Sequence, residues 1–263
     1  MEAIKIDWRN EPIPLVENSA SALDYHEIEI DLGNPASSEP LVDADEYGLA
    51  TANYYGRNDG LNAPYYRAFE KALSKIWLRK SVALRLRSVN EVLAPYGAEL
   101  CLLDCYRPVA LQKEVWDHFC ARAKETLDNP DESEVVNYAG HYCSDPRGFD
   151  ENNFKTWPVH STGGACDLLL RARSNKEHLF FGSIFDDASE ISYTDHFEKL
   201  EAKSSSEIEA CRNRRLLYWA MTACGFVNYP YEWWHFDLGT QMWVMNSGDP
   251  ERKAYYGYMK SPE

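Results

Sequence analysis

The sequence is short of basic residues, with 27 lysines and arginines against 42 aspartates and glutamates among 263 residues. The resulting formal net charge of −15 does not suit a protein that holds a nucleic-acid backbone on a basic surface. We therefore expect no nucleic-acid partner. Disorder is excluded too, because hydrophobic residues make up 44% of the chain and aromatic residues 13%, which is enough for a folded core.

Long hydrophobic runs are absent as well. The longest apolar stretch, 216–225, contains Thr222 and is much shorter than the ~20 residues that cross a bilayer. The start of the chain carries Glu2, Lys5 and Asp7, where a secretory peptide would have its apolar segment. We therefore expect a cytoplasmic protein without a membrane partner.

Cysteine pairs at the spacing of a zinc ribbon or a redox motif are missing. The seven cysteines are an odd number, and no two of them enclose two residues. We expect reduced and mostly buried thiols. The chain also has no internal repeat and no linker rich in glycine or serine, so we expect a single domain. No feature of the sequence indicates an oligomeric state.

Helices and short strands are both expected from the pattern of apolar residues. The expected helices cover 65–78, 82–93, 108–127 and 206–225. Pro108 is suited to the first turn of its helix, and Ser206 with Glu209 forms a capping box. The expected strands cover 100–104, 165–170, 179–182, 226–229, 232–238 and 241–245. This order predicts an α+β fold with a central antiparallel sheet and helices packed on it.

The first 46 residues differ in character from the rest of the chain. They contain four prolines in a background of serine, aspartate and glutamate, and only Ile28, Ile30 and Leu32 alternate as in a strand. We interpret 1–46 as an extension wrapped on the surface of a domain that covers 47–263. A second polar segment, 128–157, is expected to be a loop with at most a short helix.

Two segments carry residues suited to catalysis. His160 precedes a glycine-containing turn, and Asp167 follows in the middle of an apolar strand. A buried carboxylate without a partner is costly, so Asp167 is either a hydrogen-bonded structural residue or a ligand of a cation. Glu232 precedes His235 by three residues in an aromatic segment, which on its own is equally typical of a half-buried strand. Both spacings are common by chance and decide nothing alone.

The combination of these residues is more informative. Two histidines and one aspartate are a ligand set suited to zinc, and they leave the fourth tetrahedral position for water, as in catalytic sites. Glu232 would then act as a general base, and Arg107, at an expected strand-to-helix turn, would stabilise an oxyanion. In a regular strand Glu232 and His235 point to opposite faces, but both have to reach one metal site. A bend near Trp233 is therefore required.

The sequence resembles the D-alanyl-D-alanine dipeptidases, VanX-type zinc enzymes related to D-Ala-D-Ala carboxypeptidases and to the hedgehog signalling domain. The resemblance extends over roughly 47–238. The segments that carry it are 104–108, 160–167, 182–186, 213–215, 221–229 and 232–235.

The resemblance implies a role for each candidate residue. The zinc ligands of the family fall on His160, Asp167 and His235, which implies one zinc ion per chain. The catalytic base falls on Glu232, and the arginine that stabilises the transition state falls on Arg107.

Substrate contacts are implied in the same way. The carboxylate that receives the free amino group of a dipeptide falls on Asp186, and a substrate-binding tyrosine falls on Tyr47. A serine two residues before the first zinc-binding histidine of the family is replaced here by Pro158. This departure affects the dipeptide preference and leaves the zinc ligands unchanged.

The expected function is therefore hydrolysis of D-alanyl-D-alanine, a small dipeptide substrate, by a zinc metallopeptidase. One alternative is a related D,D- or L,D-carboxypeptidase that acts on peptidoglycan peptides. Another is a non-catalytic, zinc-stabilised binding module, and the presence of both Glu232 and Arg107 argues against it.

Overall fold

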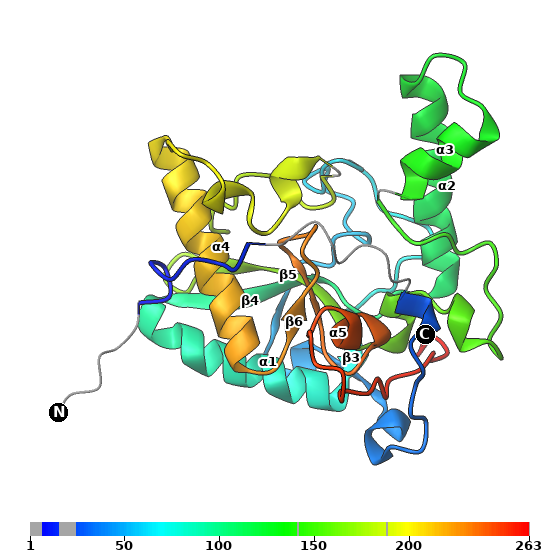
Figure 1. Cartoon of the computed structure of the whole chain (residues 1–263), viewed down its shortest axis with the longest axis horizontal. Helices are drawn as coiled ribbons and strands as arrows, with labels where there is room; N and C mark the ends of the chain where they lie inside the picture. Colours follow the sequence, from blue (N-terminus) through cyan, green and yellow to red (C-terminus); the bar gives the residue numbers. More distant parts are fainter. Residues whose placement is uncertain (1–6, 16–24, 141, 188, 263) are drawn as a thin grey trace.

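A five-stranded sheet in the order β2-β4-β5-β7-β6 forms the centre of the computed structural model, which describes residues 7–15, 25–140, 142–187 and 189–262 (Figure 1). The strands are β2 (Ala50–Thr51), β4 (Ala98–Asp104), β5 (Ala165–Ala172), β6 (Val227–Asn228) and β7 (His235–Asp237). The β2–β4 pair is parallel and the other pairs are antiparallel. The predicted α+β fold around a mainly antiparallel sheet is confirmed.

The helices divide into a layer on the sheet and a projecting arm. The α-helices are α1 (Lys80–Leu93), α2 (Val109–Thr126), α3 (Glu132–Gly140), α4 (Ser205–Ala223) and α5 (Gln241–Met245). Helices α1 and α4 pack on each other and on the sheet, whereas α2 and α3 pack together and extend from the body (Figure 1).

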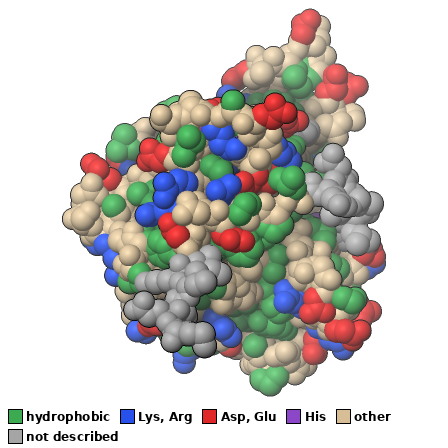
Figure 2. Space-filling view, turned by 60° about the vertical axis from the view of Figure 1, so that its left-hand side comes forward, with side chains coloured by type: hydrophobic (Ala, Val, Ile, Leu, Met, Phe, Trp, Pro, Cys, Tyr) green, Lys and Arg blue, Asp and Glu red, His purple; other side chains and the backbone are tan. Residues whose placement is uncertain are grey.

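On the face seen in Figure 2, acidic and basic side chains are interspersed.

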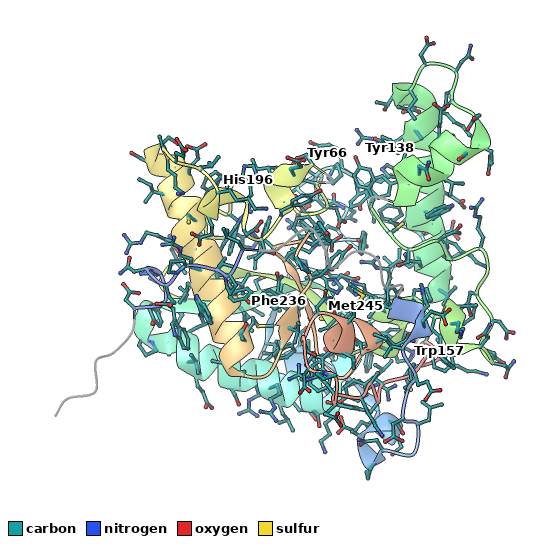
Figure 3. The ribbon with its side chains drawn as sticks, in the orientation of Figure 1. Tyr66, Tyr138, Trp157, His196, Phe236 and Met245 are labelled. Atoms are coloured by element: carbon teal, nitrogen blue, oxygen red, sulfur yellow. The ribbon has the colours of Figure 1, made fainter. Side chains whose placement is uncertain are left out.

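The central strands are buried on both faces, which explains why their sequences are almost continuously apolar. Leu100, Leu102, Leu168 and Leu170 are fully buried. Phe236 of β7 is fully buried and is labelled near the middle of the view in Figure 3. Polar side chains in these strands therefore lie in a nearly water-free environment and need partners.

Strand register brings three polar side chains together. Asp104 is paired with Asp167 across β4 and β5, and Asp167 is paired with His235 across β5 and β7. Residues directly opposite each other in antiparallel strands have side chains on the same face. The sheet thus presents Asp104, Asp167 and His235 side by side.

The helix predicted over 65–78 is wrong. This segment consists of turns and ends in β3 (Trp77–Arg79), which pairs with β1 (Leu41–Asp43). Its backbone N–H groups find partners outside a helix, because the Glu114 carboxylate accepts from the amides of Glu70 and Lys71 at 2.9 Å. Tertiary contacts have overridden the helical periodicity.

Other predicted elements differ in type or position. Residues 241–245 form helix α5 and not a strand, because the Thr240 hydroxyl accepts from the Trp243 amide at 3.0 Å and caps the helix. Residues 179–182 form no strand, although the Leu179 amide donates to the Leu170 carbonyl of β5 at 2.9 Å, next to a bridge between Arg171 and His178. The capping box of α4 is formed by Ser204 and Glu207, two residues earlier than predicted.

Parts of the predicted N-terminal extension contact the domain. Its residues 1–6 and 16–24 lie outside the described residues. In the remainder, Ile30 bridges Ala254 and the Asp31 amide donates to the Ala254 carbonyl at 2.8 Å. The strand-like alternation at 28–32 therefore corresponds to a single β-bridge and not to a strand. The domain boundary at residue 47 stays a prediction.

The predicted state of the cysteines is confirmed. All seven are unpaired, and only Cys120 is not buried. Within the described parts of the chain, every helix is too short or too polar to cross a membrane.

Candidate active site

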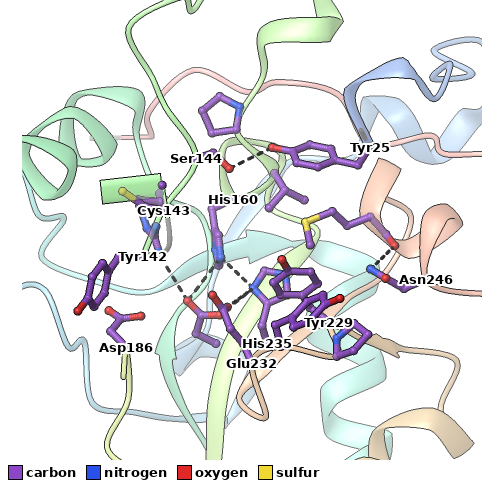
Figure 4. Close-up of a pocket in the computed structure, with 18 of the residues that line it drawn as sticks. Tyr25, Tyr142, Cys143, Ser144, His160, Asp186, Tyr229, Glu232, His235 and Asn246 are labelled. Atoms are coloured by element: carbon purple, nitrogen blue, oxygen red, sulfur yellow. Dashed lines mark hydrogen bonds and ion pairs between the residues drawn. The ribbon is translucent and has the colours of Figure 1, made fainter. Parts of the chain in front are cut away.

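Three predicted metal ligands converge in one buried cluster (Figure 4). His160 lies on the 3-10 helix η7 (Val159–Thr162) just before β5, and His235 is the first residue of β7. Asp167 Oδ2 lies 3.4 Å from His160 Nε2, and Asp167 Oδ1 lies 3.0 Å from His235 Nδ1. The two histidine nitrogens are 3.3 Å apart.

The outer nitrogens of both histidines are hydrogen-bonded. His160 Nδ1 donates to the Cys105 carbonyl at 2.8 Å, and His235 Nε2 donates to Asp237 Oδ2 at 2.8 Å. The Thr240 hydroxyl donates to the other Asp237 oxygen at 2.7 Å. These bonds orient His160 Nε2 and His235 Nδ1 inward, as in carboxylate–histidine–metal arrangements.

The protonation of the cluster follows from its burial and charges. Burial lowers the pKa of His160 to about 3, so this imidazole is neutral. Burial also opposes the charged form of His235, but Asp237 and Asp167 outweigh it and raise the pKa of His235 well above its usual value. Two imidazoles and one carboxylate with oriented donor atoms fit a divalent metal ion, and His235 would have to lose its Nδ1 proton to act as a ligand.

Arg107 is fixed beside the ligand cluster. It lies three residues after Asp104, the last residue of β4, and its Nε atom donates to Asp104 Oδ2 at 2.8 Å. Its Nη1 atom donates to Gln112 Oε1 at 3.0 Å, and its Nη2 atom donates to Asp167 Oδ2 at 3.3 Å. Burial opposes the charge, but Tyr55, Asp104 and Asp167 outweigh burial and raise the pKa of Arg107 well above its usual value. The guanidinium is therefore a fixed positive charge.

Glu232 reaches the same cluster from a turn. The His235 amide donates to the Glu232 carbonyl at 3.2 Å, so β7 begins at His235 and the predicted bend at Trp233 is found. Glu232 Oε2 lies 3.8 Å from His235 Nδ1, and the side chain is 25% exposed. Burial raises the pKa of Glu232 to about 8, with Asp167 acting in the same direction and His235 against it.

Asp186 is a second buried acid in the pocket. Its Oδ2 atom accepts from the hydroxyls of Tyr65 at 2.6 Å and Tyr55 at 2.9 Å. Burial, reinforced by Asp167 and opposed by Arg107, raises the pKa of Asp186 to about 7. The backbone φ of Asp186 is 57°, a left-handed conformation that is uncommon for a residue other than glycine. Backbone strain of this kind is concentrated at functional sites.

The structure does not bring Tyr47 to this pocket. Tyr47 ends the 3-10 helix η4 (Asp45–Tyr47), is half-buried against the main core and is not among the lining residues. The tyrosines that contact Asp186 are Tyr55 and Tyr65, which sequence reasoning missed. The one signal in the sequence is their place in an aromatic segment, 54–69, for part of which the pattern predicts a helix.

The pocket around the cluster has a volume of about 460 Å³. Asp186 lies on one side of the histidine pair, and Tyr25 and Asn246 lie on the other (Figure 4). Pro158 is part of the lining. A His–Asp–His ligand set beside a fixed arginine and a carboxylate of raised pKa is the arrangement of a metallopeptidase centre.

Comparison with known proteins agrees with this class. The Peptidase_M15 family model, described as D-ala-D-ala dipeptidase, matches residues 62–252. A D-alanyl-D-alanine dipeptidase of Synechocystis sp. is 31% identical over 241 residues, which cover 85% of this chain and 96% of that protein. A D-alanyl-D-alanine dipeptidase of Enterococcus faecalis is 32% identical over 161 residues, which cover 60% of this chain and 71% of that protein. The chain belongs to the D-Ala-D-Ala dipeptidase family and is a metallopeptidase.

The structural comparison is more distant. A variant of the vancomycin-resistance D,D-pentapeptidase VanY aligns with a TM-score of 0.40 and 16% identity, over 71% of this chain and 88% of that one. The matched family region, 62–252, contains the three candidate ligands, Arg107, Asp186 and Glu232, and leaves out Tyr47 and Tyr25.

Proposed function

We propose that this protein hydrolyses D-alanyl-D-alanine to two molecules of D-alanine, with one zinc ion held by His160, Asp167 and His235. The observation that carries the proposal is the convergence of these three ligand atoms, all within 4.8 Å of one another, beside Glu232 and Arg107. The dipeptidase relatives support the choice of substrate.

Zinc suits this ligand set better than magnesium or calcium, because imidazole nitrogens are poor ligands for those harder cations. When bound, zinc would supply a Lewis acid that polarises the scissile carbonyl and makes water more acidic.

Glu232 is the proposed proton carrier of the reaction. A group whose pKa is raised to about 8 in the absence of metal has a high affinity for protons. Its side chain lines the pocket, is partly exposed and has its Oε2 atom 3.8 Å from His235 Nδ1, so water beside the cluster is within its reach. Glu232 takes a proton from the attacking water and passes it to the amine of the leaving D-alanine.

Arg107 is the proposed partner of the negative charge that develops on the attacked carbonyl oxygen. Its guanidinium is held by Asp104 and Gln112 before substrate arrives, so little reorganisation is needed when the oxyanion forms. The contact to Asp167 at 3.3 Å places this charge at the ligand cluster.

Asp186 is the proposed acceptor of the ammonium group of the dipeptide. Its carboxylate is held by two tyrosine hydroxyls and is only 8% exposed. An ammonium group that leaves water on binding is stabilised strongly by a fixed, desolvated carboxylate. This contact favours substrates with a free amino group one residue before the cleaved bond.

Release of D-alanine from D-Ala-D-Ala by the purified chain tests the proposal directly. We expect activity that is lost on treatment with a chelator and recovered with one equivalent of zinc. N-acetyl-D-Ala-D-Ala should be cleaved far more slowly. Equal cleavage of the blocked dipeptide would favour a carboxypeptidase, and no cleavage of either would favour a binding module.

A further inference from the structure

The side of the pocket opposite Asp186 is lined in part by a segment from the start of the described chain (Figure 4). Residues 25–31, which we call the N-terminal strap, begin with the 3-10 helix η2 (Tyr25–Glu27) and end at the bridge to Ala254. Tyr25 lines the pocket together with Ser144, and their hydroxyls lie 3.3 Å apart. The strap lies outside the matched family region of 62–252.

The strap is anchored at several points. The Gln241 side chain, which is only 4% exposed, donates to the carbonyls of Ile28 at 2.7 Å and His26 at 3.4 Å. Glu27 forms an ion pair with Lys155. Since Gln241 begins helix α5, the strap and α5 form one wall, and Tyr25 packs in a small apolar cluster with Val159 and Met242.

This wall faces the metal cluster from the side away from the ammonium site. In Figure 4 the histidine pair lies between Asp186 on one side and Tyr25 and Asn246 on the other. A dipeptide whose ammonium group is at Asp186 places its cleaved bond at the cluster and its second residue toward Tyr25. Each further residue lengthens an extended peptide by about 3.3–3.6 Å, which has to be accommodated at the wall.

We propose that the N-terminal strap limits the substrate to a single residue beyond the cleaved bond, with Tyr25 as the residue that determines this specificity. The inference rests on the proposed dipeptidase function. Asp186 then selects a free amino group at one end of the substrate, and the strap excludes extension at the carboxyl end. Together the two contacts define a dipeptide by its length.

The test compares D-Ala-D-Ala with D-Ala-D-Ala-Gly as substrates of the zinc-loaded chain. Chromatography separates cleavage of the first tripeptide bond, which gives D-Ala-Gly, from cleavage of the second, which gives glycine. The measured quantity is the ratio of kcat/KM for first-bond cleavage of the tripeptide to kcat/KM for the dipeptide. We expect a low ratio in the unaltered protein, and a rise of about tenfold or more in Tyr25→Ala, because a pocket wall is removed.

Matched variants separate the wall from other effects. Tyr25→Phe keeps the ring and loses the hydroxyl, so its ratio should stay low. Glu27→Ala alters the same short helix outside the pocket lining and removes only an exposed ion pair, so its ratio should change by less than about twofold. Gln241→Ala releases the strap from α5 and should raise the ratio in the same direction as Tyr25→Ala, which keeps the proposal testable if Tyr25→Ala does not fold.

Two outcomes overturn the proposal separately from the dipeptidase function. The first is a high ratio of tripeptide to dipeptide kcat/KM in the unaltered protein. The second is a ratio that stays unchanged in Tyr25→Ala and in Gln241→Ala, when both variants are folded and contain zinc. If the unaltered protein cleaves neither peptide, the dipeptidase function is wrong and the strap proposal is wrong with it.

Discussion

His235 donates its Nε2 proton to Asp237, two residues further along the same strand, and this bond determines which ring nitrogen of His235 faces the other two candidate ligands, His160 and Asp167. Asp237 is fully buried, and its second oxygen is held by the Thr240 hydroxyl. The Asp237 carboxylate is therefore shielded from solvent water, and its bond to Nε2 keeps the His235 ring in one orientation.

Asp237→Asn should weaken zinc binding by about 10- to 100-fold, as expected when the partner of a ligand histidine is changed. Competition with a chromophoric chelator measures this affinity without relying on turnover. Asp43→Asn is the matched control, because Asp43 is 2% exposed and pairs with Lys75 outside the pocket lining. Equal affinities of the two variants for zinc would contradict the role given to Asp237.

Glu232→Ala should keep zinc bound and lower kcat by roughly 10² to 10⁴, the usual effect of losing a general base. Metal analysis and initial rates with D-Ala-D-Ala check the two parts independently. Near-normal kcat in a variant that contains zinc would mean that another group carries the proton.

Arg107→Lys should lower kcat/KM by about 10², although the charge is retained, because lysine does not reproduce the forked contacts to Asp104 and Gln112. Arg171→Lys is a suitable control. Arg171 lies on β5, the strand that contains Asp167, but it forms its ion pair with Glu99 and does not line the pocket. A similar loss in both variants would indicate general destabilisation of the sheet.

The pKa of about 7 at Asp186 predicts opposite effects of pH on binding and on stability. The ionised form binds an ammonium group, so KM should rise as the pH falls below about 7. The folded chain holds the Asp186 proton more tightly than the unfolded chain, whose carboxyl has the ordinary pKa of 3.8. This group therefore stabilises the fold at low pH, and the contribution is lost as the pH rises through about 7.

Asp186→Asn removes the ionisation and tests both effects. Its KM should be high and nearly independent of pH between 6 and 8. At pH 8 its Tm should exceed that of the unaltered protein by at least about 2 °C. A lower Tm of the variant at pH 8 would show that the ionised Asp186 carboxylate does not destabilise the fold.

The ligand set could be inferred from sequence because its residues form two short segments and their chemistry is selective. His160 and Asp167 flank one turn at the start of β5, and Glu232 and His235 flank another before β7. The bend at Trp233 is predicted from two premises, the period of a strand and the requirement that Glu232 and His235 meet at one metal site. The pairing of Asp167 with His235 across β5 and β7 could not be read from the sequence, because register depends on the assembled sheet.

The substrate side of the site was harder to predict. Tyr55 and Tyr65 reach Asp186 through a loop whose backbone is held by side chains such as Glu114, and such contacts leave no periodic signal. Tyr47 was inferred from resemblance, and it lies against the core instead. Tyr25 was hidden in a segment that looked like a surface extension, and only tertiary contacts bring it to the pocket.

The short pairing of β7 has a consequence for the lifetime of the protein in a cell. β7 is joined to β5 through three residue pairs, and one of these pairs is Asp167 with His235. An ion bound there would cross-link two strands, and a ligand present at a thousand times its Kd stabilises a fold by about 4 kcal/mol. Zinc starvation should therefore deplete the protein itself as well as its activity, because chains without metal would be open to proteases more often. Cleavage by a nonspecific protease should be faster in chelator than in zinc, and equal rates would contradict this coupling.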